Sequence, residues 1–192
     1  MPTHQPEALN FMLTRRSRPA KTLIAPGPDR AALTPMLEAA ARVPDHGKLE
    51  PWRFIVLGQA AMGRLADLAH KRAMELELGE EKAVKGALMF RDAPMMVAVV
   101  SGPVESEKVP EVEQVLSAGA VCLSLLNAAL ASGWGANWLS GPMSLDRAFL
   151  RDGLSLADHE TVAGFLVIGT ETNPPPERPR PDLDTKTEWV AA

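Results

Sequence analysis

The sequence predicts one domain in which helices flank a β-sheet, and three features lead to this expectation. Its 192 residues suit a single domain, 1–192, with a tail. Residues 94–100 form a near-continuous apolar run, which is typical of a strand buried on both faces. Residues 109–132 form a long helical segment whose middle is apolar nearly all round, which indicates a buried central helix.

The segments before residue 58 predict two helices and a strand. A helix is expected at 7–14, with Pro6 in a first turn where its missing N–H costs nothing. Apolar side chains at helical spacing predict a second helix over 29–42, which Pro44 ends. The aromatic and β-branched segment 52–57 is typical of a strand.

Three further helices and two further strands complete the expected order, with Ser144 as an N-cap. The helices are expected at 60–78, 82–90 and 145–151, and the strands at 136–139 and 161–168. This order lacks the strict strand–helix alternation and the G-x-G-x-x-G turn of a nucleotide-binding Rossmann unit. From about residue 171 the chain is Pro-rich and extended, and Trp189 near its end predicts that this tail docks on something.

Composition narrows the class of protein. The net charge of -4 lacks the basic footprint of a nucleic-acid binder. The single cysteine, Cys122, lies in an apolar run and is expected in the core, which fits a reducing compartment. The N-terminus lacks a signal-peptide pattern, and no uncharged apolar run is long enough to span a bilayer. We therefore expect a cytoplasmic protein without nucleic-acid or membrane partners.

Arg15-Arg16-Ser17, at the end of the first helix, is a candidate phosphate site. Two guanidinium groups and a hydroxyl can hold a phosphate through charge-assisted hydrogen bonds. A solvated basic turn is the simpler interpretation of so short a motif.

Two other segments could place binding groups. Arg42 and His46 lie in an irregular loop fixed by prolines, where His46 could donate to a phosphate or sugar hydroxyl or only cap its own loop. Asp45 could cap Gly47 or Lys48. The remaining histidines show no metal-ligand spacing, and no metal site is expected.

The short strand at 136–139 runs into Ser140-Gly141, which could expose backbone N–H groups to a ligand or form an ordinary turn. At the start of the long helix, Glu113 and Gln114 are not explained by packing. No Ser/His/Asp or Cys/His nucleophile set stands out, so no catalytic side chain is predicted.

Together and in this order, these segments resemble the nitroreductase family of flavoproteins, in its minimal single-domain form, from about Glu7 to Thr170. The likeness rests on five motifs: Arg15-Arg16-Ser17; Arg42-x-Pro44-Asp45-His46 with Pro51-Trp52-Arg53-Phe54; Pro110-x-x-Glu113-Gln114-x-x-Ser117-Ala118-Gly119; Trp138-x-Ser140-Gly141; and Val162-x-Gly164-Phe165-Leu166-x-x-Gly169-Thr170.

The resemblance implies an α+β fold in which a mixed, mostly antiparallel sheet is wrapped by helices. It also implies an intertwined homodimer with FMN at each end of the subunit interface, and the long helix near Val109 as a dimerisation element. Arg15, Arg16 and Ser17 would hold the FMN phosphate and ribityl chain. Arg42 and His46 would be further FMN contacts, which the partner subunit could supply.

The resemblance assigns two more groups of cofactor contacts. Trp138, Leu139 and Ser140 would line the isoalloxazine, and a nicotinamide-nucleotide contact would involve Ala128, Ala129, Leu130, Ala131, Ser132 and Gly133. Family members often add a basic residue near the C-terminus, for which Arg178 and Arg180 are available.

The implied activity is FMN-dependent transfer of hydride from NAD(P)H to a nitroaromatic, quinone or related small molecule, with the flavin carrying the chemistry. Three alternatives remain open from the sequence. The chain could be another flavin-dependent dehydrogenase, dehalogenase or flavin-modifying enzyme, because function lies in the site and not in the fold. It could be a non-catalytic FMN-binding module, or a phosphate-binding protein without flavin.

Overall fold

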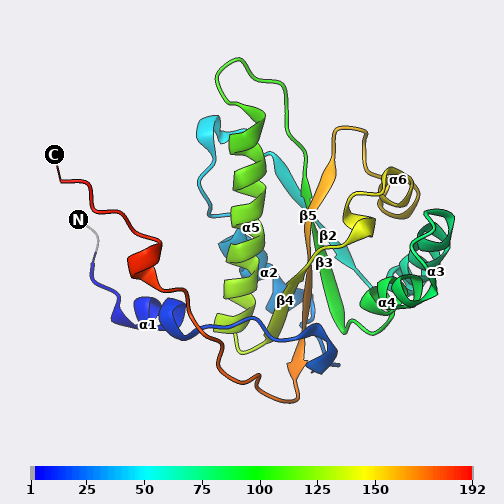
Figure 1. Ribbon diagram of the computed structural model, residues 1–192, viewed down its shortest axis with the longest axis horizontal. Helices are drawn as coiled ribbons and strands as arrows, with labels where there is room; N and C mark the ends of the chain where they lie inside the picture. Colours follow the sequence, from blue (N-terminus) through cyan, green and yellow to red (C-terminus); the bar gives the residue numbers. More distant parts are fainter. Residues whose placement is uncertain (1–2, 192) are drawn as a thin grey trace.

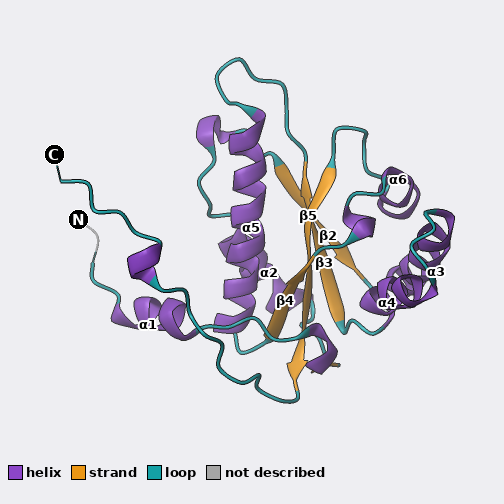
Figure 2. Ribbon diagram, viewed as in Figure 1, coloured by secondary structure: helices purple, strands orange, loops and turns teal. Residues whose placement is uncertain are grey.

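The computed structural model describes residues 3–191, in which five strands form one sheet with helices on both faces (Figure 1; Figure 2). The helices are α1 (Pro6–Thr14), α2 (Arg30–Ala40), α3 (Gln59–Glu75), α4 (Glu80–Arg91), α5 (Glu111–Ala131) and α6 (Arg147–Leu154). The strands are β1 (Leu23–Ile24), β2 (Trp52–Leu57), β3 (Met95–Ser101), β4 (Gly135–Leu139) and β5 (Thr161–Glu171). Short 3₁₀ turns are η1 (Ala20–Thr22), η2 (His46–Lys48), η3 (Pro142–Ser144) and η4 (Leu183–Thr185).

Strand β5 organises the sheet. It pairs with β3 over 161–168, with β4 over 165–169 and with β1 at its end, while β2 pairs with the far edge of β3. Each of these pairings within residues 3–191 is antiparallel. The α+β class and the mostly antiparallel sheet are confirmed, and the expected mixed character is not seen within one chain.

Strand β3 explains why residues 94–100 are apolar throughout. Successive side chains of a strand point to opposite faces. Val97 and Val99 pack with α2 and α5, whereas Met96, Ala98 and Val100 pack with α3, α4 and α6. Both faces of the strand are therefore buried, as predicted. On the α3–α4 side, Phe90 meets Phe165 edge to face with ring centroids 5.2 Å apart.

Helix α5 is buried along one face only. Val121, Cys122 and Leu125 pack against the sheet, and burial raises the pKa of the Cys122 thiol to about 12, so this thiol is neutral at physiological pH. The opposite face is apolar and open to solvent in one chain, at Val112, Val115, Leu116 and Leu123. The expectation of a fully buried helix is therefore wrong for a single chain, which leaves a hydrophobic surface without a cover.

By length and composition, α5 is the one helix within residues 3–191 that could cross a membrane, with a mean hydropathy of 1.7. In the structure, 44% of that stretch is buried inside the fold. The core helix of a soluble protein meets the same criteria, so this finding alone indicates no membrane span.

Two local features differ from the sequence prediction. Helix α6 begins at Arg147, and its N-cap is Asp146, which accepts from the Phe149 N–H at 2.8 Å and is held by Arg72 at 2.8 Å. The expected cap, Ser144, instead ends η3, where its hydroxyl accepts from the Gly141 N–H. Strand β1 was not predicted, because two residues are too short to show a periodic pattern.

The Pro-rich tail does not dock on the body of its own chain. Nearly all of residues 172–191 are exposed, and Trp189 is 90% exposed. Figure 1 shows that α1 and the tail leave the body on the same side, close to one end of α5. The expected docking of the tail is thus not seen within one chain.

Candidate functional site

The basic segment 15–18 is anchored to strand β4. Arg15 is the C-cap of helix α1, and its backbone N–H donates to the Phe11 carbonyl. Further along, the Arg18 N–H donates to the Ala136 carbonyl at 2.8 Å, and the Asn137 amide donates to the Arg18 carbonyl at 2.5 Å. These backbone contacts fix where the three arginine side chains begin.

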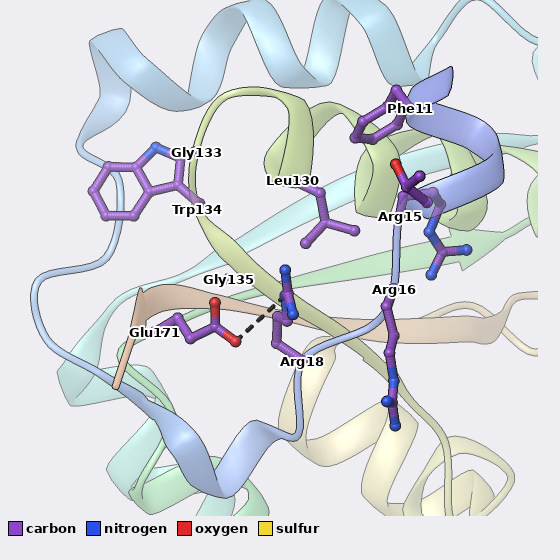
Figure 3. Close-up of a pocket in the computed structure, with 10 residues that line it drawn as sticks. Phe11, Arg15, Arg16, Arg18, Leu130, Gly133, Trp134, Gly135 and Glu171 are labelled. Carbon is purple, nitrogen blue, oxygen red and sulfur yellow. Dashed lines mark ion pairs between the residues drawn. The ribbon is translucent and has the colours of Figure 1, made fainter. Parts of the chain in front are cut away.

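Three arginines, the end of α5 and the end of β5 line a half-open cavity of about 280 Å³ (Figure 3). Its polar and aromatic lining includes Arg15, Arg16, Arg18, Trp134 and Glu171, and its apolar lining includes Phe11 and Leu130. Gly133 and Gly135 complete the wall on either side of Trp134. Two segments that the sequence singled out separately, 15–17 and 128–133, therefore meet here.

The arginines of this cavity carry hydrogen-bond donors without partners. Arg15 Nε and Arg16 Nη1 are shielded from solvent, and neither donates a hydrogen bond to any residue within 3–191. Arg15 Nη2 donates to the Ser17 hydroxyl at 3.3 Å. A buried charged donor without an acceptor is unfavourable. The cavity is therefore suited to an anion that accepts these hydrogen bonds.

Positive charge is crowded around Arg15. Its pKa lies below the usual value for arginine, first because the guanidinium is buried and then because of the charges of Arg180 and Arg18. A guanidinium remains a cation at neutral pH. An anion in the cavity would relieve this repulsion. The structure thus brings Arg180 of the tail, one of two basic residues left open by the sequence, into the field of Arg15.

The segment 128–133 contributes only two of its six residues to the cavity, Leu130 and Gly133. Ala129 is buried in the core and Ala128 packs beside it. Ala131 and Ser132 are exposed at the end of α5, where the Ser132 N–H donates to the Ala128 carbonyl.

Trp138 and Leu139 lie at the end of β4 and Ser140 follows it, all outside the cavity. Trp138 is three residues beyond Gly135, about 10 Å along a strand. Its indole N–H donates to the Ala163 carbonyl at 3.2 Å, and the ring lies over Gly164, where any Cβ would overlap it. Leu139 packs against the core, and Ser140 is exposed. The orientation of the Trp138 ring is therefore set by the glycine on the neighbouring strand.

Gly164→Ala should displace the Trp138 indole. Overpacking of this kind costs about 1–3 kcal/mol of unfolding free energy, because neither the ring nor strand β5 has room for a methyl group. Urea unfolding and tryptophan fluorescence would measure the change. The control is Gly63→Ala in α3, where an added Cβ meets nothing within 4 Å. Equal stability of Gly164→Ala and the parent would contradict this description of the ring.

Arg42 and His46 lie at the other end of α5. Both are exposed, and His46 Nδ1 lies 2.8 Å from Glu113 Oε2 in the first turn of the helix. The distance from Glu113 to Leu130 along the helix is about 26 Å. One chain therefore does not bring Arg42 and His46 to the cavity, and the predicted site residues form two groups at opposite ends of α5.

The structure also shows which groups Asp45 and Gln114 contact. The Asp45 carboxylate caps the N–H groups of Leu49 and Glu50, so the expected capping of Gly47 or Lys48 is wrong by two residues. The buried Gln114 amide exchanges hydrogen bonds of 2.9 Å with the backbone of Val104. Gln114 thus has a structural role in holding the loop before α5.

A second, smaller hollow of about 120 Å³ lies beside the Arg53–Glu160 ion pair. Arg53 donates two hydrogen bonds to the Glu160 carboxylate, at 2.6 and 2.9 Å, and the Ala157 N–H donates a third at 2.9 Å. The hydrogen bonds from Arg53, and then that from Ala157, lower the pKa of Glu160 to about 2 against the opposing effect of burial.

The Arg53–Glu160 pair predicts an acid-sensitive contribution to stability. Because the folded pKa of Glu160 lies below the unfolded value, the contribution is fully present above about pH 4.5 and is lost as the pH falls through about 2. Glu160→Gln should lower the unfolding free energy by about 1–2 kcal/mol at pH 7, after allowance for the solvent exposure of Arg53. The difference from the parent should shrink toward pH 2 in urea titrations. A difference independent of pH would contradict the assignment.

Six residues that line the larger cavity were not predicted as site residues: Phe11, Thr14, Arg18, Trp134, Gly135 and Glu171. Arg18 continues the basic run of Arg15-Arg16, and this proximity was the available signal. Trp134 lies in the short turn between α5 and β4, which carries no recognisable binding motif. Glu171 carries no local signal, because it reaches the cavity through the pairing of β5 with β1 and β4.

The fold is of the α+β class, and it carries a cavity lined by three arginines. Residues 14–170 match the nitroreductase family, and the chain belongs to that family. A protein of Haemophilus influenzae named "Putative NAD(P)H nitroreductase" is 38% identical over 166 residues, covering 85% of this chain and 88% of that protein. Escherichia coli YdjA, which bears the same name, is 32% identical over the same shares.

Solved structures show the same fold. A nitroreductase-like family protein from Bacillus cereus has a TM-score of 0.78 at 21% identity, covering 99% of this chain and 98% of that one. An FMN-dependent nitroreductase from Clostridium difficile has a TM-score of 0.67 at 18% identity, covering 94% and 98%. The predicted family and fold are thereby confirmed.

Proposed function

We propose that this protein is an FMN-dependent oxidoreductase that passes hydride from NAD(P)H, by way of the flavin, to a nitroaromatic, quinone or related acceptor. The observation that carries the proposal is the pair of shielded donors on Arg15 and Arg16, which have no acceptor among residues 3–191 of a nitroreductase-family chain. The names of the relatives support the choice of donor and cofactor: NAD(P)H is named for the Haemophilus protein and FMN for the Clostridium protein.

The donors fit the phosphate of FMN. A phosphate monoester offers several acceptor oxygens and negative charge, which match guanidinium groups through charge-assisted and bidentate hydrogen bonds. Arg15 and Arg16 would hold the phosphate, Ser17 would contact the phosphate or ribityl chain, and Arg180 would add charge from the tail. We assign the basic FMN contact near the C-terminus to Arg180, because the charge of Arg180 already lowers the pKa of Arg15.

The remaining proposed flavin and nucleotide contacts lie around strand β4 and at the end of α5. The flavin, when bound, supplies the hydride chemistry itself. Trp138, Leu139 and Ser140 would line its ring, and their neighbouring backbone N–H groups would favour negative charge on that ring. Of segment 128–133, Leu130 and Gly133 would be the nucleotide contacts, a choice supported by their position as the only two of the six residues that line the cavity.

We further propose that two copies form an intertwined homodimer with one FMN site at each end of the interface. The cavity of one chain is slightly smaller than the roughly 300–1,000 Å³ that usually holds a small ligand. Antiparallel packing of the exposed apolar faces of two α5 helices would bury Val112, Leu116 and Leu123. The same twofold arrangement would bring Arg42 and His46 of one copy to the cavity of the other.

The proposal places the chain in the cytoplasm as one domain, 1–192, with a tail from about residue 171. The single sheet flanked by two hydrophobic clusters supports one domain. The net charge of -4 and the single buried cysteine support a reducing compartment and argue against a nucleic-acid partner. The small-molecule acceptor is the proposed partner besides the second copy.

Anaerobic reduction tests the proposed activity. The purified protein, loaded with FMN, is mixed with NADPH or NADH without oxygen while the visible spectrum is recorded. The flavin band should bleach and should return on addition of a nitroaromatic or a quinone. A bound flavin that neither nucleotide reduces would contradict the enzyme and favour a binding module.

A further inference from the structure

Glu171 is a carboxylate inside a cavity lined by arginines, and neither the motifs nor the family resemblance gave it a role. It is the last residue of β5, and its side chain is 24% exposed. Figure 3 shows its carboxylate turned toward Arg18 at the wall of the cavity. Glu171 therefore lies in the same site as Arg15 and Arg16.

The Glu171 carboxylate is incompletely satisfied. Arg18 Nε lies 3.4 Å from Oε1, which is close enough for an ion pair but not for a well-formed hydrogen bond. Oε1 is shielded from solvent and accepts no hydrogen bond from residues within 3–191. A shielded carboxylate oxygen that accepts no hydrogen bond is unfavourable. The cavity is therefore suited to a ligand that carries a hydrogen-bond donor as well as an anionic group.

The backbone fixes where this carboxylate begins. Glu171 pairs with Leu23 in β1, and Gly135 of β4 crosses close to it. A Cβ on Gly135 would lie 3.3 Å from the Glu171 Cβ and would overlap the Leu23 side chain. Three strands thus meet at this point with no space for a larger residue, which holds the acid at the cavity wall.

The cavity therefore combines two complementary demands on its ligand. The Arg15 and Arg16 donors need an acceptor, and the Glu171 acceptor needs a donor. A phosphate alone satisfies only the first demand, and a carboxylate beside it would repel it. A phosphorylated polyol satisfies both, because its hydroxyl groups donate while its phosphate accepts.

We propose that Glu171 is a positioning residue that accepts a hydrogen bond from a hydroxyl of the polyol chain of the bound ligand, while Arg15 and Arg16 hold its phosphate. The assignment rests on the proposed function and deepens it, since the ribityl phosphate of FMN is such a ligand. Glu171 then recognises the polyol independently of the phosphate. The site distinguishes a phosphorylated polyol from inorganic phosphate through this one acid.

Comparing the binding of FMN with the binding of riboflavin distinguishes a hydrogen bond between Glu171 and the polyol chain from simple charge balance between Glu171 and Arg18. Riboflavin has the polyol chain but no phosphate. Glu171→Ala should weaken the binding of both flavins by a similar factor, about tenfold to a hundredfold for a lost charge-assisted hydrogen bond. Glu171→Gln, which keeps a neutral acceptor, should lose less. Arg15→Ala should weaken FMN binding and leave riboflavin binding unchanged.

Quenching of flavin fluorescence on titration with the full-length protein gives the dissociation constants. Glu38→Ala, an exposed acid on α2, is the matched control and should change neither constant. Urea unfolding without flavin checks that each variant is folded, and Glu171→Gln keeps the size of the side chain if Glu171→Ala is unstable.

The outcomes separate the inference from the proposed function. Tighter FMN binding by folded Glu171→Ala or Glu171→Gln, with riboflavin binding unchanged, would assign Glu171 to charge balance with Arg18 and would overturn the inference while the flavin function stands. A parent protein that binds neither flavin would overturn the proposed function, and the polyol assignment with it.

Discussion

Leu116→Glu should separate the proposed dimer into folded monomers that no longer bind FMN. Leu116 lies on the open face of α5 and is 67% exposed in one chain, so the new carboxylate costs the isolated fold little. In an apolar interface the same charge would be buried without a partner, at about 3–5 kcal/mol. This corresponds to at least a hundredfold weaker dimer. Sedimentation velocity would measure the assembly, and circular dichroism would confirm the fold.

The matched control is Leu88→Glu on α4. Leu88 is also exposed, but Figure 1 shows that α4 lies on the opposite side of the sheet from α5. This variant should remain a dimer and should bind FMN as the parent does. A Leu116→Glu variant that stays dimeric and keeps its flavin would show that the open face of α5 is not the subunit interface.

Arg15→Ala should weaken FMN binding by about tenfold to a hundredfold, which is the loss expected for one charge-assisted contact of about 1.5–3 kcal/mol. The stability of the flavin-free protein should not fall by a comparable amount, because Arg15 is repelled by Arg180 and Arg18 and its Nε has no hydrogen-bond acceptor among residues 3–191. Fluorescence titration with FMN and urea unfolding would measure the two quantities.

Arg30→Ala is the control for Arg15→Ala. Arg30 is an exposed residue in the first turn of α2, away from the cavity lining. Its removal should leave FMN affinity unchanged. If Arg15→Ala bound FMN as tightly as Arg30→Ala, the phosphate assignment would be wrong.

Most helices and strands could be predicted because each carries its own periodic signal. The apolar run at 94–100 predicted a strand covered on both faces, and Val97 and Ala98 do face different cores. The signal failed where an element is very short, as in β1, or where two polar residues compete to cap a helix. Ser144 and Asp146 were both available before α6, and the ion pair with Arg72 accompanies the choice of Asp146.

The site was only partly predictable, because a motif reports residue chemistry but not distance. Arg15 and Arg16 were predicted as candidate phosphate contacts, and both line the cavity. Their separation from His46 by nearly the length of α5 could not be obtained from the sequence, nor could the one-sided burial of that helix. Glu171 was missed because three paired strands, and no local pattern, bring it to the arginines.

Native mass spectrometry of the FMN-loaded protein tests the central claim most directly, because one spectrum counts both chains and flavins. The account predicts a complex of two 20.6 kDa chains with two FMN molecules, and loss of the flavins together with the dimer in Leu116→Glu. A monomer that carries one FMN, or a dimer that takes up no FMN, would contradict a flavin site shared between two copies of this chain.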